Sequence, residues 1–251
     1  DLSKTCSDFR QEVMGSRFTT KITNGKHKSY NNMSDTTIAI LSAGSGSRIK
    51  SHEPRSLIKI GNKTLIEHQL STIRDCFESP DIIAVVGCKA EKIIKKMRGD
   101  VRIVENQIHD ATNTSESIRL AFNNGLKKNF LFMHGDLYFN TSTLKNVDYS
   151  KSFVIIDNKD MILNKEVGLT VFDDTATIFS YGLSTKWCQI AYVTGKEMKI
   201  LKNIFNKFDH THKKMLSFEI LNKMISMGAK FKCYEPADMS ILEIDRIKDL
   251  K

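Results

Sequence analysis

The sequence predicts an α/β protein with a mainly parallel, mixed central sheet and helices on both faces. From residue 36 onward, short apolar strand signals alternate with amphipathic helix signals. Strand–helix–strand units of this length are typical of crossovers between parallel strands. The chain has 251 residues, of which 40% are hydrophobic and 27% charged, so it has room for one large domain or two small ones.

The first half alternates between the two signals. Leu65, Ile66 and Leu70 recur at helical spacing and predict one of its helices. Gly125 supplies the C-terminal stop of another. The expected elements are, in order, strand 38–41, helix 64–76, strand 81–86, helix 90–97, strand 101–104, helix 115–125 and strand 130–133.

After residue 150 the pattern changes to strands joined by short turns, followed by two helices and two short strands. Four strands come first, then the helices. The expected elements are strands 153–156, 167–172, 177–180 and 188–193, helices 195–208 and 217–227, and strands 231–235 and 241–244.

Residues 1–34 differ from the rest because they are polar and contain few periodic apolar positions. We interpret them as an N-terminal extension or linker, and residues 35–251 as the folded domain. The chain begins with Asp1, and Met33 directly precedes the apparent start of the domain. We therefore expect that this is a domain cut from a longer polypeptide.

Charge and composition narrow the class of partner. The net charge of +9 suits an anionic partner, or simply a solvated lysine-rich surface. Basic and aromatic residues do not interleave, so we expect no nucleic acid. No apolar run approaches the roughly 20 residues of a membrane helix, so we expect no membrane. Five scattered cysteines without a C-x-x-C pair favour a cytoplasmic location over a disulfide framework or zinc site.

A glycine-rich loop follows the first strand. Gly44 and Gly46 are followed by Arg48, and Arg55 comes soon after. The pattern is not a P-loop, and Ile49 stands where a dinucleotide motif needs a third glycine. A plain turn would explain the glycines but not the two arginines. Backbone N–H groups and arginines match phosphate oxygens, which predicts a site for a nucleoside triphosphate.

Two aspartates follow apolar strands further along the chain. Asp136 comes directly after strand 130–133 and Gly135, and Asp245 follows the last strand. Asp136 suits either a turn or a Mg²⁺ ligand, and Asp245 either a helix N-cap or a second ligand. Because ligands bind at the carboxyl ends of parallel strands, we expect the glycine loop and Asp136 to converge.

Several stretches together carry a family resemblance. Residues 41–48 resemble an L-x-A-G-x-G-x-R loop, and residues 53–67 resemble a P-K-x-L…G…P-L-I segment. Residues 112–117 resemble a stretch that contacts the base. Gly135-Asp136 and the ending that starts at Glu243-Ile-Asp245 resemble the positions of two metal aspartates.

From residue 37 onward the chain thus resembles nucleotidyltransferases with a Rossmann-like, GT-A-like α/β fold, the MobA-like NTP transferases. Within them it is most similar to the small cytidylyltransferases of the phosphocholine and aminoethylphosphonate type. The resemblance implies Mg²⁺-dependent transfer of CMP from CTP to phosphocholine, phosphoethanolamine or 2-aminoethylphosphonate, with release of pyrophosphate. Residues 35–150 would bind the nucleotide and residues 151–251 the acceptor.

The resemblance also implies roles for individual residues. Arg48, Arg55, Asp136 and Asp245 would be catalytic, with Mg²⁺ held by the two aspartates. The nucleotide would contact Leu41, Ala43, Gly44, Ser45, Gly46, Ser47, Gly87, Asn113, Thr114 and Ser117. The acceptor would contact residues suited to a trimethylammonium group, unless these are simply core: Trp187, Tyr192, Tyr181, Phe218, Glu219 and Glu243.

The sequence departs from the family at one position and leaves alternatives open. Arg55 stands where the family has lysine, which keeps the charge but changes its geometry. A sugar-1-phosphate or other NTP transferase of the same fold, or a non-catalytic nucleotide-binding regulatory module, would also fit. Fusion to another enzymatic domain and assembly into a homo-oligomer stay open as well.

Overall fold

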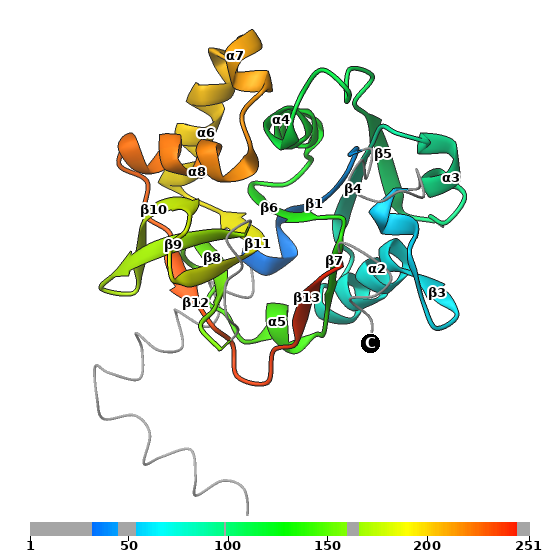
Figure 1. Ribbon diagram of the computed structural model, residues 1–251, viewed down its shortest axis with the longest axis horizontal. Coiled ribbons are helices and arrows are strands. Elements are labelled where there is room, and N and C mark those ends of the chain that lie inside the picture. Colours follow the sequence, from blue (N-terminus) through cyan, green and yellow to red (C-terminus); the bar gives the residue numbers. More distant parts are fainter. Residues whose placement is uncertain (1–31, 45–53, 98, 160–165, 245–251) are drawn as a thin grey trace, which may run out of the picture.

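A computed structural model describes residues 32–44, 54–97, 99–159 and 166–244 (Figure 1). Its centre is a nine-stranded mixed sheet with strand order β5-β4-β1-β6-β11-β8-β12-β10-β9. The predicted α/β class is confirmed. The strands are β1 (Thr36–Ser42), β4 (Asp81–Val86), β5 (Val101–Glu105), β6 (Asn129–His134), β8 (Phe153–Asp157), β9 (Val167–Phe172), β10 (Thr175–Tyr181), β11 (Thr185–Val193) and β12 (Lys232–Tyr234).

The first half of the sheet is parallel. β1 lies between β4 and β6, with Ile38 opposite Ile82 on one side and Leu131 on the other. β5 continues this parallel set beyond β4. β11 then runs antiparallel to β6 and joins it to the second half, where most pairings are antiparallel. The carboxyl ends of β1, β4 and β6 therefore meet at one edge.

Helices and two small sheets complete the described chain. The described helices are η2 (Arg55–Leu57), α2 (Leu65–Cys76), α3 (Ala90–Ile94), α4 (Thr114–Asn124), α5 (Ser142–Lys145), α6 (Lys196–Asn206), α7 (His210–Lys213) and α8 (Ser217–Ser226). The small sheets pair β2 (Lys59–Ile60) with β3 (Lys63–Thr64), and β7 (Leu137–Phe139) with β13 (Ile241–Glu243). None of these helices is long and apolar enough to cross a membrane.

Two hydrophobic cores lie on opposite faces of the sheet. Successive side chains of a strand point to opposite faces, so Ala39 and Leu41 enter one core while Ile38 and Ile40 enter the other. The first core is covered by α4, α6 and α8, and the second by α2 (Figure 1). Every residue of β1 is buried, and its central stretch Ile38–Leu41 is continuously apolar because both faces of the strand are covered.

Residues 32–34 pack with the domain. The Asn32 side-chain amide donates to the Tyr149 carbonyl at 2.9 Å, and Met33 packs against the second core. The domain therefore includes at least residues 32–34, before the expected boundary at residue 35. Residues 1–31 lie outside the described residues.

Local capping produced one helix that the sequence pattern did not predict. The segment around His210 and His212 lies between the expected helices 195–208 and 217–227 and forms α7. The Asp209 carboxylate accepts a hydrogen bond from the His212 backbone N–H at 3.0 Å, which satisfies a donor at the start of the helix. Short capped turns of this kind carry no hydrophobic periodicity.

The closest approach between β1 and the turn after β6 occurs at Gly135. A Cβ at this position would lie 2.9 Å from the Leu41 carbonyl oxygen and would also collide with the Ser42 side chain. We expect Gly135→Ala to lower the free energy of unfolding by about 1–3 kcal/mol, because backbone cannot give way cheaply. Chemical denaturation checks this.

Gly44→Ala is the matched control, because a Cβ there meets no described atom within 4 Å. Its unfolding midpoint should stay close to that of the wild type. Equal stability of the Gly135 and Gly44 variants would show that the close approach is not a real constraint.

Candidate functional site

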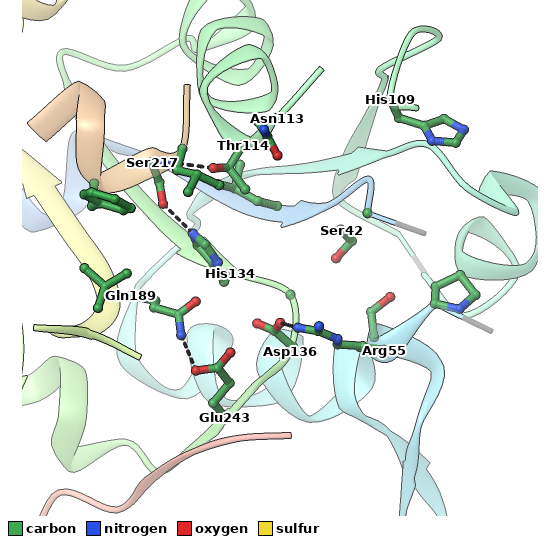
Figure 2. A pocket seen from close by; sticks show the side chains of 18 of the residues that line it. Ser42, Arg55, His109, Asn113, Thr114, His134, Asp136, Gln189, Ser217 and Glu243 are labelled. Atoms are coloured by element: carbon green, nitrogen blue, oxygen red, sulfur yellow. Dashed lines mark hydrogen bonds and ion pairs between the residues drawn. The ribbon is translucent and has the colours of Figure 1, made fainter. Parts of the chain in front are cut away.

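A cavity of about 430 Å³ opens at the carboxyl edge of β1 and β6 (Figure 2). Both halves of the sheet contribute to its wall. The residues of the first half that line it are Leu41, Ser42, Gly44, Pro54, Arg55, Ser56, His109, Asp110, Thr112, Asn113, Thr114, His134, Gly135 and Asp136. Those of the second half are Glu166, Val167, Tyr181, Trp187, Gln189, Leu216, Ser217, Phe218 and Glu243.

An ion pair between Arg55 and Asp136 crosses one wall of this cavity. Arg55 Nη1 lies 2.5 Å from Asp136 Oδ2, with 17% and 11% of the two side chains exposed. Pro54 leads into η2, and its carbonyl accepts from the Leu57 N–H at 3.0 Å, which fixes the segment that carries Arg55. The second oxygen, Asp136 Oδ1, is buried and has no hydrogen-bond partner.

The C-terminal strand β13 meets Asp136 through the backbone. β13 pairs with β7, with Glu243 opposite Leu137, and the Ile244 N–H donates to the Asp136 carbonyl at 2.8 Å. Ile244 directly precedes Asp245, the second predicted metal ligand, which lies outside the described residues. The last described residue of the chain is thus bonded to the first predicted metal ligand.

His134 forms part of the cavity floor as a neutral side chain. Burial lowers its pKa below the ordinary value, the Arg55 charge acts in the same direction, and the Asp136 charge opposes both. Its Nε2 lies 2.9 Å from the Ser217 hydroxyl, so the ring links β6 to the start of α8. A neutral histidine here avoids adding a second cation beside Arg55.

The start of α4 lines the cavity but is also tied to the segment between α7 and α8. The Asn113 side-chain amide donates to the Lys214 carbonyl at 2.8 Å. The Thr114 hydroxyl accepts from the Ser217 N–H at 2.7 Å. These side chains therefore hold the two halves of the cavity wall together in addition to facing its interior.

The far end of the cavity combines aromatic and acidic side chains. The Tyr181 and Phe218 rings meet edge to face, with centroids 5.5 Å apart. The Gln189 amide donates to Glu243 Oε2 at 2.5 Å. Gln189 has a φ of 57°, at a bulge where the register of β11 against β8 shifts. The bulge directs its side chain toward Glu243 (Figure 2).

A second ion pair lies nearby, between Lys186 Nζ and Glu166 Oε1 at 2.6 Å. Burial alone would lower the pKa of Lys186, but the hydrogen bond and charge of Glu166 outweigh it and raise the pKa. Lys186 thus remains a cation paired with Glu166. Glu166 is part of the cavity wall, whereas Lys186 is not.

Ten of the predicted site residues line the cavity: Leu41, Gly44, Arg55, Asn113, Thr114, Asp136, Tyr181, Trp187, Phe218 and Glu243. Trp187 contributes little open surface, because it is 2% exposed and its indole N–H donates to the Ile190 carbonyl. Five others lie outside the described residues: Ser45, Gly46, Ser47, Arg48 and Asp245.

The remaining predicted site residues do not line this cavity. Tyr192 is fully buried in the second core, and Ser117 is buried within α4. The Glu219 carboxylate instead accepts from the Leu216 N–H at the start of α8. The Ala43 carbonyl accepts from Cys88, and Gly87 packs beneath Ala43 and His109.

Several lining residues were missed by the sequence analysis. Ser42 and Ser56 each lie beside a residue that was predicted, so their position in the motifs was a usable signal. Glu166 and Gln189 carried no signal, because they reach the cavity only through the antiparallel half of the sheet. The missed lining residues that bear polar side chains are Ser42, Ser56, His109, Asp110, Glu166, Gln189 and Ser217.

The described residues contain no group of three or more His, Cys, Asp or Glu side chains that could hold a metal ion. A magnesium ion bound with a nucleotide takes only one or two carboxylates beside phosphate and water oxygens. The buried, unpartnered Asp136 Oδ1 is the kind of oxygen that such an ion needs. Asp136 therefore fits a Mg²⁺ ligand.

Comparison with known proteins gives partial matches in sequence. Residues 38–147 match the sequence model of the MobA-like NTP transferase domain. The bifunctional protein GlmU of Acaryochloris marina is 31% identical over 102 residues, which is 40% of this chain and 22% of the relative. GlmU of Solibacter usitatus is 30% identical over 113 residues, 44% of this chain and 24% of the relative. The chain thus matches less than a quarter of either relative's length.

Solved structures match over most of the chain. An inositol-1-phosphate CTP transferase from T. maritima has a TM-score of 0.72 at 17% identity, covering 86% of this chain and 91% of that one. A CTP:phosphocholine cytidylyltransferase from Streptococcus pneumoniae has a TM-score of 0.68 at 19% identity, covering 86% and 96%.

A nucleoside-diphosphate-sugar pyrophosphorylase from Vibrio cholerae RC9 has a TM-score of 0.66 at 10% identity, covering 84% of this chain and 97% of that one. At these identities the structures show a shared fold. Together with the match of residues 38–147 to the MobA-like NTP transferase domain, they confirm the expected resemblance to the nucleotidyltransferase superfamily.

Proposed function

We propose that this protein transfers CMP from CTP to a small phosphate or phosphonate monoester that carries an amine, and releases pyrophosphate. Phosphocholine, phosphoethanolamine and 2-aminoethylphosphonate belong to this class. The observation that carries the proposal is the largely buried Arg55–Asp136 pair, with its unpartnered oxygen Asp136 Oδ1, in the wall of a cavity at the carboxyl edge of β1 and β6. Ligands of open α/β sheets bind at such edges.

The reaction requires little covalent chemistry from the protein. An oxygen of the acceptor phosphate is already anionic near neutral pH, so it attacks the α-phosphorus of CTP without a general base. A bond forms between that oxygen and the α-phosphorus, and the bond to the bridging oxygen breaks, leaving its electron pair on pyrophosphate. The protein supplies alignment and charge neutralisation, the main contributions in phosphoryl transfer.

Arg55 is the described side chain best placed to neutralise phosphate charge, because it lies on the cavity wall beside the end of β1. Arg48, which lies outside the described residues, would add a second cation. Arg55 is also held by Asp136, so its guanidinium is oriented before the nucleotide binds. Preorganised charge of this kind stabilises a transition state without reorganisation during the reaction.

Asp136 Oδ1 would hold Mg²⁺ together with Asp245. When bound, the ion neutralises charge on the phosphates of the nucleotide and the acceptor. The Ile244 N–H to Asp136 carbonyl bond supports this pairing, because Ile244 directly precedes Asp245.

The two halves of the sheet would bind different substrates. Residues 35–150 would bind the nucleotide, since they contribute the Arg55 and Asp136 wall and the start of α4. Residues 151–251 would bind the acceptor, since they contribute Tyr181, Phe218 and Glu243. Aromatic faces with a nearby carboxylate suit an ammonium or trimethylammonium group.

An acceptor that is a sugar 1-phosphate is the alternative, because the Vibrio cholerae structure of the same fold is a nucleoside-diphosphate-sugar pyrophosphorylase. A neutral sugar could stack on the aromatic rings and donate to the carboxylate, but it would not gain the cation–π and charge pairing that an ammonium group gains there. The cationic acceptor is therefore favoured by this chain's own residues.

Pyrophosphate release tests the proposal directly. Each of the four NTPs is assayed with Mg²⁺ against phosphocholine, phosphoethanolamine, 2-aminoethylphosphonate and a set of sugar 1-phosphates. We expect release with CTP and an amine-bearing acceptor. Release with a sugar 1-phosphate alone would establish the alternative, and nucleotide binding without release would indicate a regulatory module.

Asp136→Asn should lower turnover by about 100-fold or more while leaving the fold intact, because the amide keeps the shape but loses the charge. Steady-state pyrophosphate release and thermal unfolding measure the two effects. Asp81→Asn is the matched control, since Asp81 pairs with Arg102 at the amino edge of the same strands.

The control variant should lose about 1.5–3 kcal/mol of stability, typical of a hydrogen bond to a charged group, but keep its turnover at a temperature where it is folded. If Asp136→Asn turned over like the wild type, Asp136 would have no role in catalysis.

Tyr181→Ala should raise the KM for an amine-bearing acceptor roughly 5- to 30-fold, corresponding to about 1–2 kcal/mol of cation–π interaction. The KM for CTP should hardly change, because Tyr181 lies at the acceptor end. Tyr181→Phe should behave like the wild type. Phe172→Ala, on the same β9–β10 hairpin but outside the cavity and 77% exposed, is the surface control.

A further inference from the structure

Two serine hydroxyls on the cavity wall have no hydrogen-bond partner. Ser42 ends β1 and is 6% exposed, and Ser56 lies in η2 and is 3% exposed. Both Oγ atoms are buried and unpartnered, as is Asp136 Oδ1 on the same wall. Figure 2 shows the Ser42 side chain directed into the cavity on the side of Arg55 and Asp136.

Unpartnered buried hydroxyls are unusual and need an explanation, because they lose their hydrogen bonds to water without replacement. Two other buried serines among the described residues are satisfied. The Ser115 hydroxyl donates to the His212 carbonyl at 2.6 Å, and the Ser152 hydroxyl both donates to the Thr194 carbonyl and accepts from its N–H. The deficit at Ser42 and Ser56 is therefore local to the cavity.

The charges on the wall indicate which ligand atoms would form hydrogen bonds with these hydroxyls. Among the described lining residues Arg55 is the only lysine or arginine, against carboxylates at Asp110, Asp136, Glu166 and Glu243. An anionic ligand here needs hydrogen-bond donors beyond the one guanidinium. A hydroxyl can donate to an anionic oxygen and brings no charge of its own.

The position of both serines in the chain points to the same ligand. Ser42 directly precedes Ala43-Gly44, where the glycine loop begins, and Ser56 directly follows Arg55. Both stand at variable positions of the motifs that the chain resembles, the x of L-x-A-G and the x of P-K-x-L. The motifs therefore assign them no role, although the structure brings both to the wall that holds Arg55 and Asp136.

We propose that the Ser42 and Ser56 hydroxyls are positioning residues that donate hydrogen bonds to phosphate oxygens of the bound nucleoside triphosphate. This inference rests on the proposed function only in that the ligand is the same nucleotide. Neutral donors beside Arg55 fix the orientation of the phosphate chain. They do so without strengthening the ion pairing between the bound phosphates and the protein before the reaction.

If the two hydroxyls only stabilised the fold, removing them would lower the melting temperature and leave ligand affinity unchanged. A role in ligand binding predicts the reverse. Ser42→Ala and Ser56→Ala each remove a hydroxyl that makes no bond in the folded chain, so the melting temperature should hold or rise. Ser152→Ala is the matched control, because it removes a bonded hydroxyl away from the cavity. It should lower the melting temperature and leave ligand affinity unchanged.

Calorimetric titration with Mg²⁺–CTP, and separately with inorganic tripolyphosphate as the probe, measures affinity. We expect each cavity variant to bind both about tenfold more weakly, as for loss of one hydrogen bond to a charged group. Affinities equal to those of the wild type, together with lower melting temperatures, would overturn the inference while leaving the proposed function intact.

The tripolyphosphate arm keeps the two proposals separable. A wild type that releases no pyrophosphate with any NTP would contradict the proposed function. Weaker tripolyphosphate binding by both serine variants would then still support the hydroxyl contacts, and unchanged binding would refute them.

Discussion

The site depends on one constraint, the parallel pairing of β1 with β6. This pairing brings the ends of two strands, distant in the sequence, to one edge of the sheet, and it leaves no room for a side chain at Gly135. The Gly135 N–H bonds to the Leu41 carbonyl at 2.9 Å, so Asp136 emerges directly beside the end of β1. Arg55 and the start of the glycine loop therefore lie close to Asp136 because of the backbone path, and no side chain has to span a long distance.

The electrostatics of the cavity follow from this close approach. Asp136 uses one oxygen to hold Arg55, and its other oxygen has no partner among the described residues, while desolvation keeps the pKa of His134 below its ordinary value. Of the described lining residues, more are carboxylates than cations. A polyphosphate could occupy such a wall only with added positive charge, which explains why the proposal combines Arg55, Arg48 and a divalent cation.

Much of the fold and part of the site could be predicted from the sequence, for a physical reason. Strands buried on both faces and helices with one apolar face leave clear periodicity, so β4 and β9 were predicted to the residue. Asp136 and Arg55 lie in local motifs next to such strands. Gln189 reaches the cavity through a bulge and a left-handed φ, and Glu166 reaches it through antiparallel pairing. No local pattern encodes either of these.

The same physics places two of the predicted aromatic residues in the interior. Tyr192 and Trp187 are on the same strand five residues apart, so their side chains point to opposite faces of the sheet. Tyr192 enters the second core and Trp187 the first, so neither offers the open ring that Tyr181 does. Strand residues buried by two-sided packing cannot also bind a ligand. The acceptor end is therefore built from the ends of β10 and the start of α8, where packing stops.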